Sequence, residues 1–299
     1  MKFHHCTIIM LFLSVPTAWS TESKPQSAPE IVAAAERGDA DAQFQLARAY
    51  LRGEGVPKDV KKAFELMKAS ADQGNADAIG GLGYFFSNGI AVPKDEKQAL
   101  EWFRKGAEKG SAKAQLNLGN LLLSGAKNSG TTSENNPAEG LLWIKNAADQ
   151  NLPEACLAYG SILFSGEHGL PMNYEVAARY LKIAAAADIA AAQNIMGMMS
   201  DFGWGVPVDK AMAEQWFRKA ALQGYPKAQT NLACILGPLS ADKQTRLEAL
   251  AWLLIAADQD EITATKELDD TVQGLKNGEM DAARVKALEL RELIQKNVP

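Results

Sequence analysis

Few residues in this sequence have the type and spacing needed for nucleophilic catalysis. Two Ser-x-x-Lys matches, at 124–127 and 240–243, have the spacing used by penicillin-binding proteins and β-lactamases, and residues 133–135 match Ser-x-Asn. That chemistry needs a serine at the start of a helix, a lysine one turn later and a following Lys-Thr-Gly. Both Ser-x-x-Lys matches are predicted to lie in turns, and no Lys-Thr-Gly follows them. We interpret them as chance matches.

Thiol and metal chemistry also lack their usual residue sets. His168 is the only histidine outside the first 20 residues, and it lies in the turn 166–169, where a solvated side chain is expected. Cys156 follows a packed alanine at no recognisable metal-ligand spacing, so a Cys156–His168 nucleophile pair would require contact across the fold. We expect no catalytic residue, no metal ion and no cofactor. Cys156 and Cys234 are predicted to be buried thiols without a disulfide between them.

The composition predicts an all-α protein. Hydrophobic residues make up 47% of the chain but aromatic residues only 7%, and the apolar share is dominated by alanine and leucine, which favour helices. The formal charge is −5. An acidic surface repels nucleic acid and anionic membranes, so we expect neither as a partner.

Residues 1–20 have the features of a signal peptide. Lys2 provides the basic start, Cys6 to Val15 the apolar core, and Ala18-Trp19-Ser20 the small residues of a cleavage site. The mature chain is expected to begin near Thr21 and to lie in the periplasm, with secretion as the alternative. The apolar run is too short to span a bilayer, and no later stretch approaches about 18 uninterrupted apolar residues. An uncleaved N-terminal anchor is the other reading of this segment.

A repeat of about 36 residues, built round an anchor alanine, occupies most of the chain. Four residues after each anchor comes a large apolar residue, followed by a glycine or alanine. Steps of three and four place these residues on one helical face, and the tiny residue indicates that a neighbouring helix crosses closely there. The anchors are Ala42, Ala78, Ala114, Ala155, Ala192 and Ala228, and the tiny residues are Ala47, Gly83, Gly119, Gly160, Gly197 and Ala233.

Each first helix is expected to end in a glycine-rich turn, and a second helix then follows. Asp59, Asp95 and Asp209 stand where they could cap it. The second helix has its own column of small residues, with a large residue three positions later that we expect to pack in the core rather than to form a ligand cage. These large residues are Leu66, Trp102, Trp143, Tyr180, Trp216 and Trp252.

The expected organisation is therefore one solenoid. Helix pairs of this length cannot bury their own apolar faces, so they must stack into a superhelix whose ends need capping helices. We expect a signal peptide at 1–20, an N-terminal segment with a capping helix at 21–38, six repeats at 39–257 and C-terminal capping helices at 258–299. The third unit differs because residues 125–137 form a long polar turn.

The phrases from Ala42 to Tyr50 and from Gly53 to Pro57, together with 99–105 and 213–221, resemble those of the Sel-1-like repeat proteins. These proteins are a branch of the tetratricopeptide-like α/α superhelices. The resemblance covers nearly all of the chain after the leader. It implies an all-α superhelical solenoid that binds other proteins, while fold-level analogy leaves the partner open.

The resemblance also implies where binding occurs. In such superhelices the first helix of each pair lines the concave surface, through positions one before the anchor and two, six and nine after it. Carried onto this chain, the partner-binding residues are Phe44, Arg48, Leu51, Tyr84, Ser87, Leu116, Asn120, Leu123, Leu157, Ser161, Phe164, Asn194, Met198 and Asp201. For the leucines, packing against the next unit is an equally good interpretation.

The leading hypothesis is a non-enzymatic, exported binding protein whose partner is another protein, either a toxin or a component of the envelope. Exported relatives include immunity proteins that silence antibacterial lipase effectors, and adaptors in envelope assembly, signalling and host contact. Some relatives have been associated with penicillin binding, so the alternative from another class is a weak β-lactam hydrolase.

Overall fold

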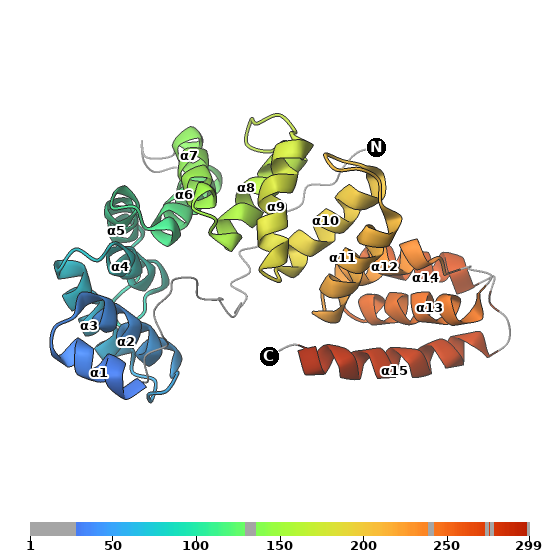
Figure 1. The fold of residues 1–299 in the computed structure, drawn as a ribbon, viewed down its shortest axis with the longest axis horizontal. Coiled ribbons are helices and arrows are strands. Elements are labelled where there is room, and N and C mark those ends of the chain that lie inside the picture. The colour runs from blue at the N-terminus through green and yellow to red at the C-terminus, as the bar shows by residue number, and fades with distance from the viewer. Residues whose placement is uncertain (1–27, 129–135, 239–241, 273–274, 276–277, 298–299) are drawn as a thin grey trace.

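The computed structural model describes residues 28–128, 136–238, 242–272, 275 and 278–297, which form fifteen α-helices and no strand. The proposed signal peptide lies outside the described residues. The helices follow one another round a curved path from α1 to α15 (Figure 1). None of those in the described ranges is both long and apolar enough to cross a bilayer.

The helices are α1 (Ala28–Glu36), α2 (Ala40–Arg52), α3 (Val60–Asp72), α4 (Ala76–Asn88), α5 (Glu96–Glu108), α6 (Ala112–Asn128), α7 (Pro137–Asp149), α8 (Pro153–Ser165), α9 (Tyr174–Ala186), α10 (Ala190–Phe202), α11 (Lys210–Leu222), α12 (Pro226–Leu236), α13 (Lys243–Ala257), α14 (Ile262–Val272) and α15 (Glu279–Asn297). The even-numbered helices α2 to α12 are the first helices of six units, and α3 to α13 are the second. The predicted helix pairs and solenoid class are confirmed.

Local sequence signals set the helix ends. The carboxylates of Asp59, Asp95 and Asp209 each accept backbone N–H bonds at the start of a second helix, as predicted. Four first helices, α2, α4, α8 and α10, end at a glycine with left-handed backbone, such as Gly53 with φ of 78°. The second helix α7 is followed by Asn151, which has φ of 59°.

The tiny residue of each first helix lies against a large side chain of the second helix. A Cβ atom at Gly83 would lie 2.6 Å from Cδ1 of Phe103, and one at Gly160 would lie 2.7 Å from Cγ of Leu181. Such distances are too short for a side chain, so the close crossing predicted at this position is confirmed. The close crossing lets the large side chain of the second helix pack directly on the backbone of the first helix.

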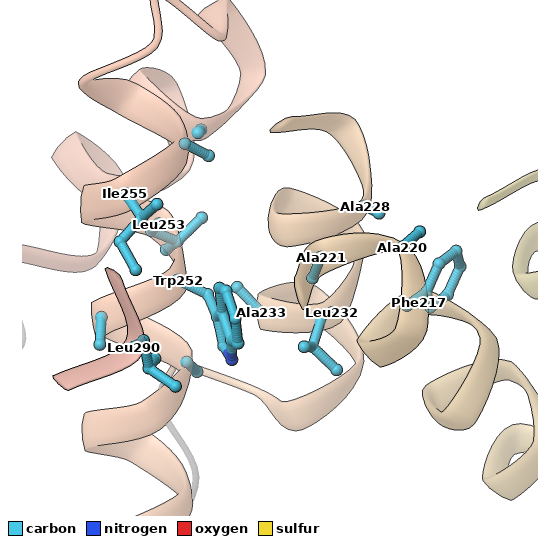
Figure 2. Close-up of a cluster of buried hydrophobic side chains, with 14 of the residues drawn as sticks. Phe217, Ala220, Ala221, Ala228, Leu232, Ala233, Trp252, Leu253, Ile255 and Leu290 are labelled. Carbon is cyan, nitrogen blue, oxygen red and sulfur yellow. The ribbon is translucent and has the colours of Figure 1, made fainter. Parts of the chain in front are cut away.

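The prediction that the tryptophan column packs in the core is confirmed, although most of its residues lie at the edge of the core and are only partly buried. In that column Trp252 is fully buried, whereas Trp102 and Trp216 are half-buried and lie under lysine ammonium groups. The side chain one position later is the buried one, because it faces the first helix directly. These residues are Met67, Phe103, Ile144, Leu181, Phe217 and Leu253, none of which is more than 4% exposed. Figure 2 shows Phe217 and Trp252 among the side chains of the last units.

A buried glutamine joins three helices in four of the units. The side-chain amide of Gln193 donates to the carbonyl of Ala185 in the preceding unit at 3.2 Å and accepts from Gln223 at 2.8 Å. The same arrangement recurs at Gln43, Gln115 and Gln229. In unit four Cys156 occupies this position, and its thiol lies 3.4 Å from the carbonyl oxygen of Ala148. The unit-to-unit contact is thus fixed by directional bonds as well as by apolar packing.

The long turn predicted for unit three begins later than expected. Helix α6 continues through residues 125–128, since Ala126 and Lys127 favour helix and no proline occurs before Pro137. Of the predicted turn, 129–135 lie outside the described residues. Ser124 and Lys127 therefore sit in the last turn of a helix, and not in a loop.

The ends of the solenoid are covered by α1 and by the pair α14 and α15. Helix α15 packs on α13 and α11. Arg246 on α13 forms a buried ion pair with Glu279 at the start of α15, with Nη2 to Oε1 of 2.6 Å. The outer face of α15 is not wholly charged as expected, because Val285 and Leu288 are 59% and 62% exposed.

Candidate protein-binding surface

The first helices share one accessible face. In the left half of Figure 1 the first helices α4 and α6 lie on the inside of the curve, and α5 and α7 lie on the outside. The six anchor alanines are at most 3% exposed, so they mark the opposite, buried face of each first helix. Positions counted from the anchors therefore show which side chains a partner can reach.

The sixth position after the anchor lies on the accessible face in every unit. Its residues, here called the sixth-position row, are Arg48, Tyr84, Asn120, Ser161, Met198 and Cys234. Asn120 and Cys234 are exposed and the other four are half-buried. The row extends along all six first helices, and five of its residues were predicted. Cys234, predicted to be a buried thiol, instead lies on this surface.

The second position after the anchor faces the next unit instead. Asn194 is 4% exposed, and its side-chain oxygen accepts a 2.8 Å hydrogen bond from Asn231 of unit six. Phe44, Leu116 and Leu157 are half-buried and pack against the buried clusters. Asn194 is therefore not available to a partner, and the other three offer only part of their surface.

The residues at the ninth position after the anchor differ in burial from unit to unit. Leu123 is 9% exposed and packs with Leu141, Ile144 and Ile162, so it belongs to the core. The remaining predicted residues at this position are half-buried. They are Leu51, Ser87, Phe164 and Asp201.

The tenth position was missed by sequence reasoning. Arg52, Asn88, Ser165 and Phe202 are exposed there, and Phe202 is the most apolar of them. Four residues separate the sixth from the tenth position, and seven separate the sixth from the position before the anchor. Residues four and seven positions apart lie on the same face of a helix, so the spacing alone could have identified the exposed residues at the tenth position.

The N-terminal half of the surface is charged. The Arg48 guanidinium lies 5.7 Å from the centroid of the Phe44 ring. Burial lowers the pKa of Arg48, and the nearby Arg52 lowers it further. Burial and the charge of Arg48 likewise lower the pKa of Lys113, although Asp77 opposes both shifts. Charged groups from units one, two and three therefore act on one another across this face.

The C-terminal half contains a pocket of about 500 Å³. We call it the unit-five pocket. It is lined by Met198, Asp201, Phe202, Lys210, Phe217, Asn231, Cys234 and Ile235. Lys210 forms an ion pair with Asp201, and its ammonium lies 5.8 Å from the centroid of the Phe202 ring. The sixth-position row thus passes from a charged half into a half with apolar walls.

Two of the candidate nucleophiles, Cys156 and Ser124, are not arranged for catalysis, whereas Ser240 and the Ser-x-Asn match at 133–135 lie outside the described residues. Cys156 is fully buried, and burial raises the pKa of its thiol to about 11, so it stays protonated at neutral pH. Ser124 lies near the end of α6 rather than at a helix start, and its hydroxyl donates to the carbonyl of Leu121 at 3.1 Å. Within the described ranges, no three His, Cys, Asp or Glu side chains are grouped so as to hold a metal ion.

Known proteins share both the sequence pattern and the fold. The Sel1 repeat model matches six consecutive segments, at residues 40–75, 76–111, 112–152, 153–189, 190–225 and 226–261. An uncharacterized protein of Neisseria meningitidis is 34% identical over 103 residues, which are 34% of this chain and 21% of that protein. The chain thus matches about a fifth of this relative's length.

Two solved structures are similar to this chain. A Sel1 repeat protein from Oxalobacter formigenes is 27% identical with a TM-score of 0.62, over 75% of this chain and 89% of that one. An immunity protein from Pseudomonas aeruginosa is 20% identical with a TM-score of 0.44, over 73% of this chain and 83% of that one. Six matched repeats, six observed helix pairs and the similar structure from Oxalobacter formigenes agree: the chain belongs to the Sel1 repeat family, whose helical solenoid is a protein-interaction fold.

Proposed function

We propose that this chain is an exported, periplasmic protein without catalytic activity that binds another protein through the sixth-position row and the exposed rows beside it. Export is supported by the basic start, apolar run and small residues of 1–20. The main observation in favour of binding is that the sixth-position row continues along all six first helices and that none of its residues is buried. A continuous strip of this kind suits a peptide or the edge of a folded partner.

Arg48 and Tyr84 are the strongest candidates for energetic anchors. Arginine and tyrosine are over-represented among residues whose loss weakens protein–protein binding most. They occupy the same position in adjacent units, and Phe44 supports the Arg48 guanidinium from the same helix. We therefore place the first contact of the partner at units one and two.

Among binding roles, we propose neutralisation of an antibacterial toxin, such as a lipase effector, as the first to test. Each helix of the described residues belongs to the six-unit solenoid or caps it. A solenoid acts directly by occupying the surface of its partner. The alternative is an adaptor in envelope assembly, signalling or host contact.

The binding proposal is tested by affinity capture from periplasmic extract. The bait is the mature protein, compared with a Phe44→Ala, Arg48→Glu, Tyr84→Ala variant. A matched variant, Glu65→Ala, Lys68→Glu, Glu101→Ala, changes exposed residues of the second helices α3 and α5. We expect one protein to be captured by the wild type and the matched variant, and lost with the first variant. Circular dichroism checks that both variants fold. Capture of the same proteins by all three baits would refute the assignment of the surface.

The role and the location need separate experiments. Deletion of the gene should make cells more sensitive to a cognate toxin, and unchanged sensitivity to every neighbouring toxin would exclude the immunity role. Mass spectrometry of the periplasmic protein should find an N-terminus near Thr21. Purified mature protein should leave a chromogenic β-lactam unhydrolysed, and turnover would revive the hydrolase alternative.

A further inference from the structure

We propose that the unit-five pocket recognises a partner segment in which an arginine or lysine stands next to a large apolar side chain. This inference rests on the proposed function, because the pocket forms the C-terminal end of the same surface. It specifies the chemistry of the partner there.

The pocket has a firm apolar floor and adaptable walls. Phe217 is 2% exposed, and its ring is held against the backbone of Gly197. Met198 and Ile235 are half-buried and leave part of their apolar surface facing the pocket. Methionine adapts its shape to different side chains. A volume of about 500 Å³ admits one large apolar side chain with part of its neighbour.

The rim of the pocket already holds a cation. The Lys210 ammonium is ion-paired with the Asp201 carboxylate and lies beside the Phe202 ring. A carboxylate combined with an aromatic face is a favourable site for lysine, and more so for arginine, whose flat guanidinium can stack on the ring. The intramolecular contact therefore shows which kind of group this rim prefers.

Lys210 can give way to a cation from the partner. Its side chain is 64% exposed, whereas that of Asp201 is 15% exposed. An ion pair with so exposed a partner contributes little to stability, so exchanging one cation for another costs little. Lys210 is also the first residue of α11, where a positive charge opposes the helix dipole. The carboxylate is thus the fixed half of the pair and the ammonium the replaceable half.

Charge outside the rim favours the same partner. Partial burial raises the pKa of the Cys234 thiol, and the nearby carboxylates of Glu267 and Glu261 raise it further. The chain as a whole has a formal charge of −5. A basic segment is therefore attracted toward this end of the surface and an acidic one is repelled.

The test is a selection from a phage-displayed library of random short peptides on the immobilised mature protein. Enriched sequences should carry arginine or lysine next to a leucine, isoleucine, methionine or aromatic residue. Binding of the enriched peptide should slow the modification of Cys234 by a maleimide, because this exposed thiol lines the pocket and Cys156 is buried. Enrichment of acidic or uncharged sequences, absence of enrichment, or unchanged Cys234 modification would overturn the proposal.

Two substitutions should act in opposite directions on binding of the enriched peptide. Asp201→Asn should weaken it about tenfold, whereas Lys210→Ala should strengthen it because the internal competitor is removed. A purely structural ion pair predicts the same direction for both changes, and that outcome contradicts the proposal. Asp281→Asn, which removes an equal charge from the remote Asp281–Arg284 pair on α15, is the matched control and should have no effect.

The outcomes separate this inference from the proposed function. A partner captured from extract and lost with the Arg48 and Tyr84 variant, together with failure of the peptide selection, refutes the pocket assignment and leaves the binding function standing. If the peptide selection succeeds but no partner is captured from extract, the result supports the pocket assignment and contradicts the proposed binding function at units one and two.

Discussion

The ring of Phe217 packs directly on the backbone of Gly197, so closely that a Cβ atom at Gly197 would lie 2.5 Å from its Cε1. Gly83 and Phe103 repeat this relationship in unit two. Units one and six instead combine an alanine with a smaller or more flexible partner, as in Ala233 and Leu253. The phenylalanine rings of units two and five therefore both face a glycine, whereas a leucine faces glycine in unit four and alanine in unit six.

Gly197→Ala should destabilise the protein. The added methyl group meets a ring that is 2% exposed and already lies against the backbone of Gly197. Overpacking of this kind costs about 1–3 kcal/mol. Urea unfolding followed by circular dichroism measures the loss.

The combination of alanine and leucine in unit six predicts that a second substitution rescues this loss. Combining Gly197→Ala with Phe217→Leu reproduces the pairing of Ala233 with Leu253, so the double variant should be more stable than the sum of the two single changes implies. Strict additivity of the two effects would show that the methyl group is accommodated elsewhere.

Gln193→Ala should cost about 1–3 kcal/mol, because it removes buried hydrogen bonds to the Ala185 carbonyl and to the Asp188 carboxylate. Gln193 is fully buried and also receives the Gln223 amide. Thermal unfolding compares this variant with Gln98→Ala, whose exposed side chain contacts only the nearby Asp95. Equal stability of the two variants would contradict a structural role for the glutamine network.

Glu279→Ala should release the last helix. The carboxylate is 6% exposed and pairs with an Arg246 side chain that is 13% exposed, so the change leaves a buried cation without this partner. Loss of one member of a buried pair costs about 3–5 kcal/mol. Hydrogen exchange should rise in α15 before it rises in α2 to α9. A uniform rise along the chain would mean that α15 does not act as a separate cap.

Cys156 should make stability fall at high pH. The folded protein raises the pKa of this thiol to about 11, chiefly by burial, while an unfolded thiol has a pKa of about 8.5. The folded state therefore holds the proton more tightly, and its advantage is complete below pH 8.5 and is lost as the pH rises toward 11. The slope is at most about 1.4 kcal/mol per pH unit. Urea unfolding between these pH values should show a flatter decline for Cys156→Ala, and parallel declines would contradict the assignment.

The sequence alone predicted the all-α solenoid, its six helix pairs and the close crossing at the tiny residues. Each of these depends on short-range signals that recur from unit to unit: a capping side chain such as Asp59, a helix-ending glycine such as Gly53, and the fixed spacing from an anchor alanine to a glycine or alanine. When a local signal recurs at a fixed interval along the chain, it predicts the individual helices and also predicts that successive helix pairs stack on one another.

Which side chains are buried could not be predicted fully, because burial depends on the rotation of one helix against the next. One residue is about 100° of helical rotation, enough to put Phe217 in the core and leave Trp216 half-buried. The same rotation buries Leu123 and Asn194 and brings Phe202 to the surface. The unit-five pocket joins residues of three helices, so only the tertiary structure could bring Asp201, Lys210 and Cys234 to one place.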